Sequence, residues 1–413
     1  MQTVAGGATK VRVSDRFMAE ENELLLLTAK PELSSAEQAR INQILELDLA
    51  WRRVTSLATG LGTWATLTRH LQNSSKRWLL DKEPTLITLR DCMSYAFIRN
   101  VYLADELVHL QDLLLQRGIE SISFKGPSLA LQVYGGLDKR LFSDLDVLVE
   151  EAKVPEVQQL MFDIGCIAEP PRNPELTLDF MQSKMFRLLT HEQTFSKPSS
   201  GFVQQPTLID VHWQIMPPHV MSYSFDYLME NTVEVEVSGG KKVRCLRPEL
   251  LLLALCSHAN KHQWVELKWL VDIVELIRRT PSLNWHEVYE LAASQSMRKQ
   301  LNLGLCLCRR AFGIDWEPLA SVEFGEDVER LAVQIMTVWF SKLIPSATLR
   351  QYIAYQMRTF DNTSKRLSFA LIELTGVDIV TYLRYPLPPA LFSLYRAIHP
   401  LRLAGDHLRA LLR

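Results

Sequence analysis

Two aspartates at the head of an apolar run carry the clearest chemical signal in this chain. Asp144 and Asp146 lie two residues apart in KRLFSDLDVLVE, residues 139–150. In a strand, this spacing places both carboxylates on one face with Leu148, where two like charges repel each other. A divalent cation between them would remove the repulsion, and Mg²⁺ takes carboxylate and phosphate oxygens as ligands. A solvated strand end is the alternative explanation of the pair.

The stretch FKGPS, residues 124–128, stands one expected helix ahead of the aspartates. Its pattern is a strand end, a glycine turn and a helix start, which presents free N–H groups and a partial positive charge to an anion. Lys125 and Ser128 would add donors around Gly126, whereas Pro127 removes one backbone donor. The phosphate loop G-x-x-x-x-G-K-[ST] is absent from the sequence, so this turn predicts a simpler phosphate site.

A third acid lies in TLIDVHWQI, residues 207–215. Alternation puts Asp210 on one face with Leu208 and His212. Carboxylates inside apolar strands are rarely left unpaired. If this strand lies beside the strand of Asp146, Asp210 becomes a third carboxylate at the same metal site, where it could help to deprotonate an attacking hydroxyl.

The pattern of apolar residues divides the chain into four parts. Residues 1–14 are expected to form a flexible tail, and 15–118 a helical region that ends at Gly118. Residues 119–247 predict a catalytic core in which helices separate the early strands, and 248–413 predict a second helical region that closes over the cleft. The fold class is therefore α+β.

Within these parts the spacing predicts individual elements. We expect one continuous helix over 34–62, capped by Ser34 or Ser35, and a second helical stretch over about 62–81. In the central part, residues 184–197 predict a strand, and 233–246 predict a hairpin that turns at a Gly-Gly pair.

These pieces together resemble the polymerase-β-like nucleotidyltransferase superfamily, and more narrowly a bacterial family of uncharacterised nucleotidyltransferases. The resemblance covers about 86–280 and is specific as a set of motifs. The superfamily usually has Gly or Ser where Pro127 follows Gly126, which makes the phosphate turn the weakest match. The motifs in this chain are FKGPSLA, KRLFSDLDVLV, IDVHW and HANKHQWVELKWLVDIVEL.

The resemblance implies a mixed sheet with flanking helices and two Mg²⁺ ions, with Mn²⁺ as an alternative. Asp144 and Asp146 would hold metal and triphosphate, and Asp210 would hold the metal nearest the acceptor. Two cations at such a place stabilise the attacking and leaving oxygens. Lys125 and Arg140 would neutralise phosphate charge, although Arg140 could instead form a salt bridge that orients the acid pair.

The helical segment SHANKHQWVELKWLVD, residues 257–272, is rich in polar groups. His258, Lys261 and His262 can share one helix face. As a lid over the nucleotide, Lys261 or His262 would contact phosphate. The His258/His262 spacing also suits zinc, but the segment contains neither the H-E-x-x-H glutamate nor a third ligand.

The same segment has a simpler interpretation, in which its polar face packs on the α/β core and Asp272 pairs with a Lys or a His. In the lid interpretation, Trp264 or Trp269 would lie near a base. Both tryptophans fit better in the core, because aromatic side chains are mostly buried.

Composition narrows the class of protein. The net charge is −2, with 47% hydrophobic and 22% charged residues, which is typical of a globular protein and argues against long nucleic acid as a partner. No apolar run approaches the roughly 18 residues of a membrane span. Most of the six cysteines lie in apolar contexts, which favours reduced thiols and a cytoplasmic location. The C-terminal end, with its prolines and basic and apolar residues, predicts a packed short helix or a membrane-surface or partner helix.

The function predicted from these residues is Mg²⁺-dependent transfer of a nucleoside monophosphate from an NTP, ATP above all, to an acceptor hydroxyl or phosphate. A small molecule, a sugar or a peptide would be the acceptor, and pyrophosphate would leave. Two alternatives stay open at this point. One is kinase-like phosphoryl transfer on the same fold, and the other is a non-catalytic module that binds nucleotide or a partner.

Overall fold

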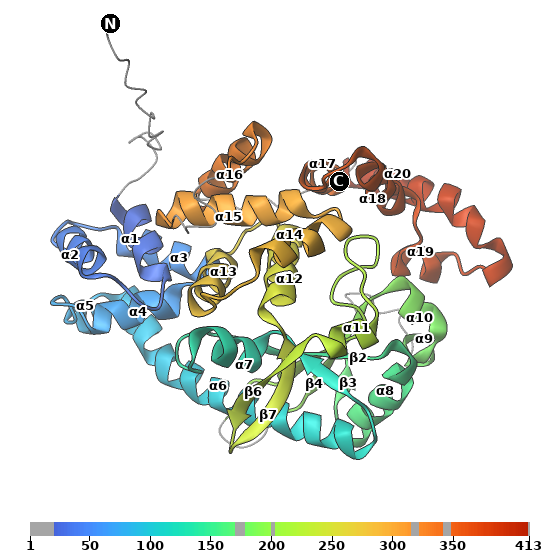
Figure 1. Ribbon diagram of the computed structural model, residues 1–413, viewed down its shortest axis with the longest axis horizontal. Coiled ribbons are helices and arrows are strands. Elements are labelled where there is room, and N and C mark those ends of the chain that lie inside the picture. Colours follow the sequence, from blue (N-terminus) through green and yellow to red (C-terminus); the bar gives the residue numbers. More distant parts are fainter. Residues whose placement is uncertain (1–19, 170–177, 200–202, 315–321, 342–347, 412–413) are drawn as a thin grey trace, which may run out of the picture.

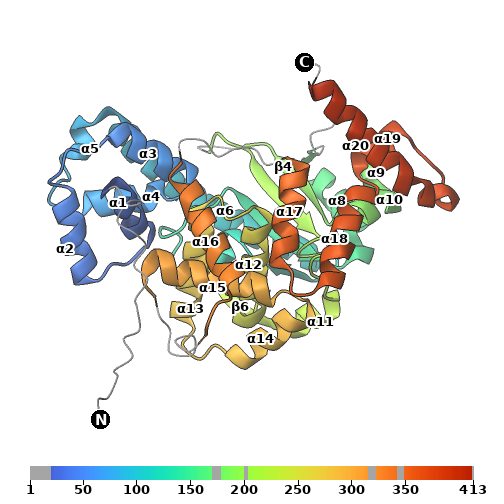
Figure 2. The same ribbon diagram turned by 90° about the horizontal axis from the view of Figure 1, so that it is seen from above.

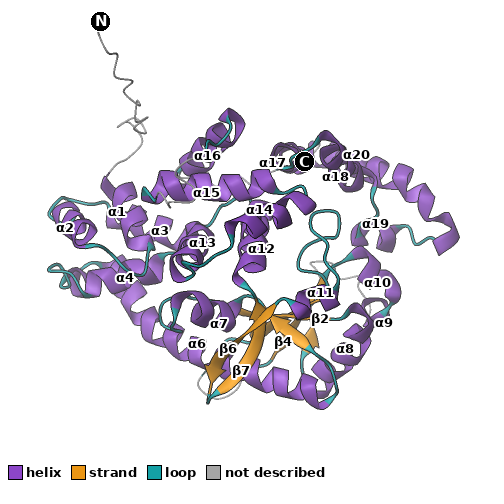
Figure 3. Cartoon of the chain, viewed as in Figure 1, coloured by secondary structure: helices purple, strands orange, loops and turns teal. Residues whose placement is uncertain are grey.

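The computed structural model describes residues 20–169, 178–199, 203–314, 322–341 and 348–411 of the 413-residue chain. The expected tail, 1–14, lies outside the described residues. Helices surround one mixed seven-stranded sheet (Figure 3), which confirms the predicted α+β class with helical regions before and after the strands.

The N-terminal region is helical, and its last helix is the longest described. Ser34 begins the second helix with a capping box, in which its side chain accepts from the Glu37 N–H and Glu37 bonds back to the Ser34 N–H. The helices are α1 (Glu20–Ala29), α2 (Ser35–Ile44), α3 (Trp51–Gly60), α4 (Trp64–Gln72), α5 (Leu79–Lys82) and α6 (Pro84–Gln116).

The sheet has the strand order β3-β4-β5-β2-β1-β7-β6. The pairs β2/β5 and β1/β7 are parallel, and the other neighbouring strands are antiparallel. The strands are β1 (Ser121–Ser123), β2 (Asp144–Val149), β3 (Ile167–Ala168), β4 (Glu192–Lys197), β5 (Thr207–His212), β6 (Thr232–Ser238) and β7 (Lys241–Leu246). Short helices join them: α7 (Gly126–Leu129), the π-helical turn η1 (Ala130–Tyr134), the 3₁₀ turn η2 (Glu151–Lys153), α8 (Val154–Asp163), α9 (Leu178–Gln182), α10 (Lys184–Leu189) and α11 (Phe225–Glu230).

The two faces of the sheet pack into different cores. Leu145, Val147 and Val149 of β2 point into a core shared with the second half of α6 and with α8. Leu148, on the other face of β2, packs in the larger core with Ile122 and the C-terminal helices. Figure 1 shows α6 below the sheet and α12 and α13 above it. The face that carries Asp144 and Asp146 is therefore the face that the C-terminal helices approach.

In its described residues, the C-terminal region consists of helices and one further 3₁₀ turn. They are α12 (Pro248–Lys261), α13 (Leu267–Arg279), α14 (Trp285–Ser294), α15 (Arg298–Phe312), α16 (Glu326–Trp339), α17 (Leu349–Thr359), α18 (Thr363–Thr375), α19 (Ile379–Arg384), η4 (Pro389–Leu394) and α20 (Tyr395–Leu411). The view from above places α1–α5 and α19–α20 at opposite ends of the molecule (Figure 2). None of the helices in the described ranges combines the length and the apolar character that crossing a membrane requires.

Three predicted elements differ from the structure. The expected helix over 34–62 is two helices, α2 and α3, so that Ile44 and Val54 both reach the core. The stretch over 62–81 is also two helices, α4 and α5. The expected strand over 184–197 begins as helix α10, because the Ser183 side chain accepts from the Phe186 N–H and caps it, and only its second half is strand β4.

Candidate active site

The parallel register of β2 and β5 brings the predicted carboxylates together. Asp146 is paired directly with Asp210, and Asp144 with Leu208. Because paired residues point to the same face, Asp144, Asp146 and Asp210 all project from one side of the sheet. Residues that lie far apart in the chain thus form one acidic site across two neighbouring strands.

A group of side chains that could hold a metal ion lies at the centre of this site. Within the described residues, one group of three metal-ligating side chains is close enough to share an ion, namely Asp146, Asp210 and His212, whose candidate ligand atoms lie within 4.8 Å of one another. Asp144 stands one alternating position away on β2 and is outside this group. Hard carboxylate oxygens with one imidazole nitrogen suit a divalent cation.

Asp146 is buried and stays ionised through two neighbours. Its Oδ1 accepts from Lys125 Nζ at 2.9 Å and lies 3.1 Å from His212 Nε2. Burial opposes ionisation, but the charge of Lys125 and the hydrogen bond from His212 outweigh it and hold the pKa of Asp146 well below its usual value. The ammonium group of Lys125 already rests on this oxygen, so the place is electrostatically suited to a cation.

Asp210 and Asp144 have the opposite tendency. Burial, followed by the negative charge of Asp146, raises the pKa of Asp210 to about 6, although Thr194 Oγ1 donates to Asp210 Oδ1 at 2.6 Å. The same two causes raise the pKa of Asp144. Two carboxylates that resist ionisation beside a third that stays charged are expected where a cation completes the site.

The glycine turn between β1 and α7 lies against β2. Gly126 has φ +60°, and a Cβ at this position would lie 2.7 Å from the carbonyl oxygen of Asp144. Only glycine fits so close to that strand in this conformation. Ser128 is fully buried, and its hydroxyl bonds to Ser123 Oγ and to the Lys125 carbonyl, each at 2.8 Å. Its hydroxyl is thus engaged inside the turn, while Lys125 points to the carboxylates.

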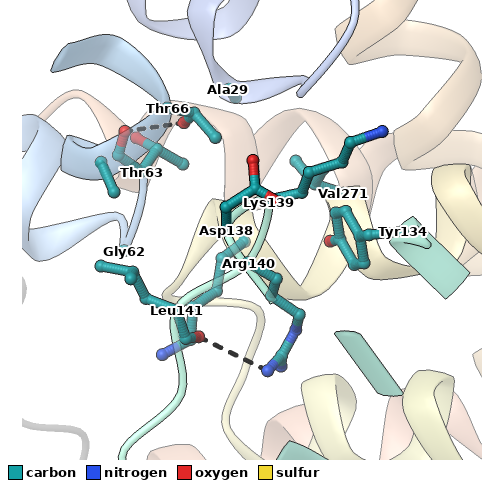
Figure 4. Close-up of a pocket in the computed structure, with 12 residues that line it drawn as sticks. Ala29, Gly62, Thr63, Thr66, Tyr134, Asp138, Lys139, Arg140, Leu141 and Val271 are labelled. Carbon is teal, nitrogen blue, oxygen red and sulfur yellow. Dashed lines mark hydrogen bonds between the residues drawn. The ribbon is translucent and has the colours of Figure 1, made fainter. Parts of the chain in front are cut away.

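Arg140, which was expected either to neutralise phosphate charge or to orient Asp144 and Asp146, pairs with a different acid. Its guanidinium donates to both carboxylate oxygens of Asp272 on α13, at 2.6 and 2.9 Å, and the Tyr134 hydroxyl donates to Asp272 at 2.6 Å. Sequence reasoning paired Asp272 with a Lys or a His, and the partner is an arginine instead. The cavity beside Arg140 holds only about 30 Å³ (Figure 4), whereas ligand sites hold roughly 300 Å³ or more.

The C-terminal end of α12 lies beside the start of β4. Lys261 Nζ is 3.5 Å from His191 Nε2, next to Glu192 of β4. Burial and the charge of Lys261 lower the pKa of His262 to about 4, so this imidazole is neutral at pH 7. His262 also packs on the ring of Trp269, with centroids 5.3 Å apart.

Trp264 has no exposed surface and packs in the larger core. It is therefore part of the interior, as expected for a buried aromatic, and cannot reach a base in this arrangement.

Comparison with known proteins now identifies the family. A family model described as uncharacterised nucleotidyltransferase matches residues 48–313, which is more than half of the chain. The chain belongs to this uncharacterised nucleotidyltransferase family. No curated protein matches it. A solved structure, that of an antigenic nucleotidyltransferase-like protein from Paracoccidioides brasiliensis, is similar over 51% of this chain and 97% of its own, with 12% identity and a TM-score of 0.30.

A cavity of about 580 Å³ opens along β4 of this nucleotidyltransferase family member. It is lined along β4 by Glu192, Thr194 and Ser196, which are paired in the sheet with His212, Asp210 and Leu208 in that order. The cavity therefore runs along β4 and reaches Leu208, on the sheet face that carries Asp210. Its apolar lining residues are Phe186, Leu189, Pro206 and Leu208.

Sequence reasoning missed several residues of the site. His212 shares the face of Asp210, so its alternation was a usable signal. Glu192 and Thr194 could not be found, because nothing local shows that β4 lies beside β5. Arg99 of α6 was also missed; it donates to the backbone carbonyls of Ser143 and Pro206, just before β2 and β5 begin.

Proposed function

We propose that this protein is a Mg²⁺-dependent nucleotidyltransferase that uses ATP. The observation that carries the proposal is the parallel β2/β5 register, which places three carboxylates on one face beside a lysine and a glycine turn. Family membership supports the general activity of nucleotidyl transfer. The metal, the nucleotide and the residue roles below are proposals that rest on this geometry.

Asp144, Asp146 and Asp210 hold the divalent cations in this proposal. Bound there, the metal neutralises charge on the triphosphate and on the attacking oxygen. Lys125 and the N–H groups around Gly126 contact the phosphates. Lys125 is placed to leave Asp146 for a phosphate oxygen when a cation takes over the neutralisation of that carboxylate.

Lys261 and His262, at the end of α12, approach the triphosphate from the covering side. Ser128 supports the turn from inside rather than touching phosphate, because both of its hydrogen bonds are internal. Arg140 acts through its ion pair with Asp272, which joins the loop before β2 to α13. Of the residues expected to bind phosphate, Lys125, Lys261 and His262 contact it in this proposal. Ser128 and Arg140 instead hold the surrounding structure in place.

The acceptor occupies the cavity along β4, next to Asp210. Its volume, about 580 Å³, suits a small molecule, a sugar or one residue of a peptide. Glu169 and Glu192 are the acidic residues among those that line it, and apolar side chains form one wall. An acceptor with hydroxyl or amine donors and an apolar portion fits this lining.

The reaction needs little covalent help from the protein. The acceptor oxygen forms a bond to the α-phosphorus, the bond from that phosphorus to the bridging oxygen breaks, and pyrophosphate leaves. The hydroxyl proton passes to the ionised carboxylate of Asp210, on the strand next to β4 and its cavity. Positioning and charge neutralisation supply most of the rate enhancement.

We place the protein in the cytoplasm. Five of its six cysteines are buried and all six are free, which fits a reducing compartment.

Labelled ATP tests the reaction type. The protein is incubated with a small-molecule extract and Mg²⁺, together with either α-³²P-ATP or γ-³²P-ATP, and products are separated by chromatography. Nucleotidyl transfer predicts extract components labelled from the α position only, with pyrophosphate released and no labelled product from Asp146→Asn. Label on an acceptor from the γ position alone would show phosphoryl transfer and contradict the proposal.

A further inference from the structure

His212 lies between two carboxylates and is almost completely buried, at 2% exposure. Its Nε2 lies 3.1 Å from Asp146 Oδ1, and its Nδ1 lies 3.2 Å from Glu192 Oε2. The Nδ1 atom has no well-aligned hydrogen-bond partner in the described part of the chain. A buried ring nitrogen without a hydrogen-bond partner costs free energy, so a bound ligand at His212 would explain this arrangement.

Glu192 lies where a carboxylate commonly orients a metal-binding histidine. Metal-binding histidines usually donate their second ring N–H to a carboxylate, which fixes the tautomer and leaves the other nitrogen for the ion. Glu192 is directly paired with His212 across β4 and β5, so the sheet itself holds the carboxylate at Nδ1. In a metal-bound form the ring proton would be on Nδ1, 3.2 Å from Glu192 Oε2, and Nε2 would no longer donate to Asp146.

The spacing at Nε2 also fits shared coordination with Asp146. Two adjacent ligands of an octahedral ion, each about 2.1 Å from it, lie roughly 3 Å apart. The observed separation between His212 Nε2 and Asp146 Oδ1 is 3.1 Å. Asp210 completes the group, since its carboxylate lies within 4.8 Å of both.

We propose that His212 Nε2 is a ligand of the catalytic cation, that Glu192 orients the ring through Nδ1, and that the centre therefore binds Mn²⁺ more tightly than the Mg²⁺ that supports the proposed transfer. The inference rests on the proposed cation site of the nucleotidyltransferase. Mg²⁺ demands oxygen ligands, whereas Mn²⁺ accepts imidazole nitrogen alongside carboxylates. Glu192 is then a positioning residue, because it acts on the ion through His212.

Pulsed electron paramagnetic resonance of the Mn²⁺-loaded full chain tests the nitrogen ligand directly. The proposal predicts ¹⁴N modulation from one bound imidazole, which changes to a ¹⁵N pattern when the protein is made with ¹⁵N-histidine. His212→Asn should remove it, and His286→Asn, an exposed histidine on α14, should not. If the His212 variant fails to fold, the isotope substitution still shows whether a histidine binds the ion, and a nitrogen signal that does not change with ¹⁵N-histidine would overturn the inference.

Affinity gives the second measurement. Competition between Mn²⁺ and Mg²⁺ should favour Mn²⁺ at least tenfold in the wild type, and the preference should shrink in His212→Asn. Glu192→Gln should keep the nitrogen signal but bind Mn²⁺ about 10–100-fold more weakly. Mn²⁺ that binds in an Asp146-dependent manner without histidine modulation would overturn the inference while the nucleotidyltransferase proposal stands. Absence of any Asp146-dependent cation binding would overturn both.

Discussion

At the scale of single residues, the site is defined by how unequally its three carboxylates hold charge. Asp146 is stabilised as an anion by Lys125 and His212, whereas Asp210 and Asp144 resist ionisation. A cation changes this balance, because it stabilises every carboxylate near it. The affinity of the site for a cation should therefore depend on pH, and measuring this dependence tests the carboxylates together.

Asp210 makes cation binding weaker in mild acid. Its pKa of about 6 is above the ordinary value, so the folded protein holds this proton up to about pH 6. This group's contribution to the free energy of unfolding is favourable at pH 4 and is lost as the pH rises through 6. The cation binds the ionised form, so we expect Mn²⁺ to raise the melting temperature clearly at pH 7 and much less at pH 5.

The control is Asp210→Asn. It should show little cation-induced stabilisation at either pH and should lose the apo protein's decline in stability between pH 4 and 6. An equal Mn²⁺ effect at pH 5 and pH 7 in the wild type would show that Asp210 does not titrate in the binding step.

Lys125 should act differently on cation and on nucleotide. Removing its ammonium group from Asp146 removes a competitor for the ion, so Lys125→Met should bind Mn²⁺ alone more tightly. Loss of a charge-assisted bond to phosphate should weaken binding of ATP with the metal by about tenfold or more. Calorimetric titration with Mn²⁺ alone and with ATP plus the metal measures the two affinities. The control is Lys242→Met, which changes an exposed lysine of the β6–β7 hairpin. Parallel changes in both affinities would argue against a phosphate contact.

At the scale of elements, the turn before α7 depends on close backbone approach. Gly126 and Gly239 have nearly the same positive φ, +60° and +57°, but a Cβ meets Asp144 at the first and open space at the second. Both alanine substitutions cost about 1 kcal/mol for the left-handed backbone. Gly126→Ala should cost more, and it should also weaken Mn²⁺ binding because it displaces Asp144.

Chemical denaturation together with cation titration measures the difference between the two glycine variants. Gly239→Ala should keep full cation affinity. If Gly126→Ala also kept it and lost no more stability than its control, the turn would not position β2.

The Arg140–Asp272 pair joins the loop before β2 to α13. Both side chains are buried, with 10% and 1% exposure, and the geometry is bidentate. Arg140→Met should lower the free energy of unfolding by about 3–5 kcal/mol, because it leaves Asp272 as an uncompensated buried charge. The double variant Arg140→Met/Asp272→Leu should recover part of this loss.

The comparison for this pair is Arg330→Met, which breaks an exposed ion pair with Glu326. That variant should be about as stable as the wild type. If the Arg140 variant were as stable as this control, the Arg140–Asp272 pair would not hold α13 to the loop before β2.

Local patterns explain why part of the elements could be predicted. Period-two alternation identified the faces of β2 and β5, and the Ser34 cap of α2 was one of two candidates. The end of α2 could not be seen, since the apolar spacing continues through 45–50 while the core requires a break there. Arg99 and Asn100 give no local signal either, although Asn100 donates to the carbonyls of Leu137 and Arg140 and holds the loop that leads to β2.

At the scale of the whole molecule, the candidate site is made by strand order and by the covering helices. The α+β class followed from the succession of helical and strand patterns, and the family model supports it over 48–313. Strand order is non-local, so the neighbours of β5 could only be assumed. The structure shows β5 between β2 and β4. Glu192 and Thr194 of β4 therefore lie at the site beside the aspartates named from sequence.

The C-terminal helices cover the same face, and this explains the polar end of α12. Lys261 lies 3.5 Å from His191, and in the proposed function it approaches the triphosphate together with His262. Arg140 and Asp272 fasten the neighbouring α13 to the core. We therefore expect the helical regions and the sheet to unfold together rather than as separate parts.

Calorimetric titration of ATP with and without Mg²⁺ or Mn²⁺ tests the central claim most directly. The wild type should bind ATP only weakly without a divalent cation and at least tenfold more tightly with one, and Asp146→Asn should lose that enhancement. Glu150→Gln, which changes an exposed acid just beyond the other end of β2, should keep it. ATP binding that is independent of the cation, or unchanged in Asp146→Asn, would contradict a carboxylate-held metal site on β2 and β5.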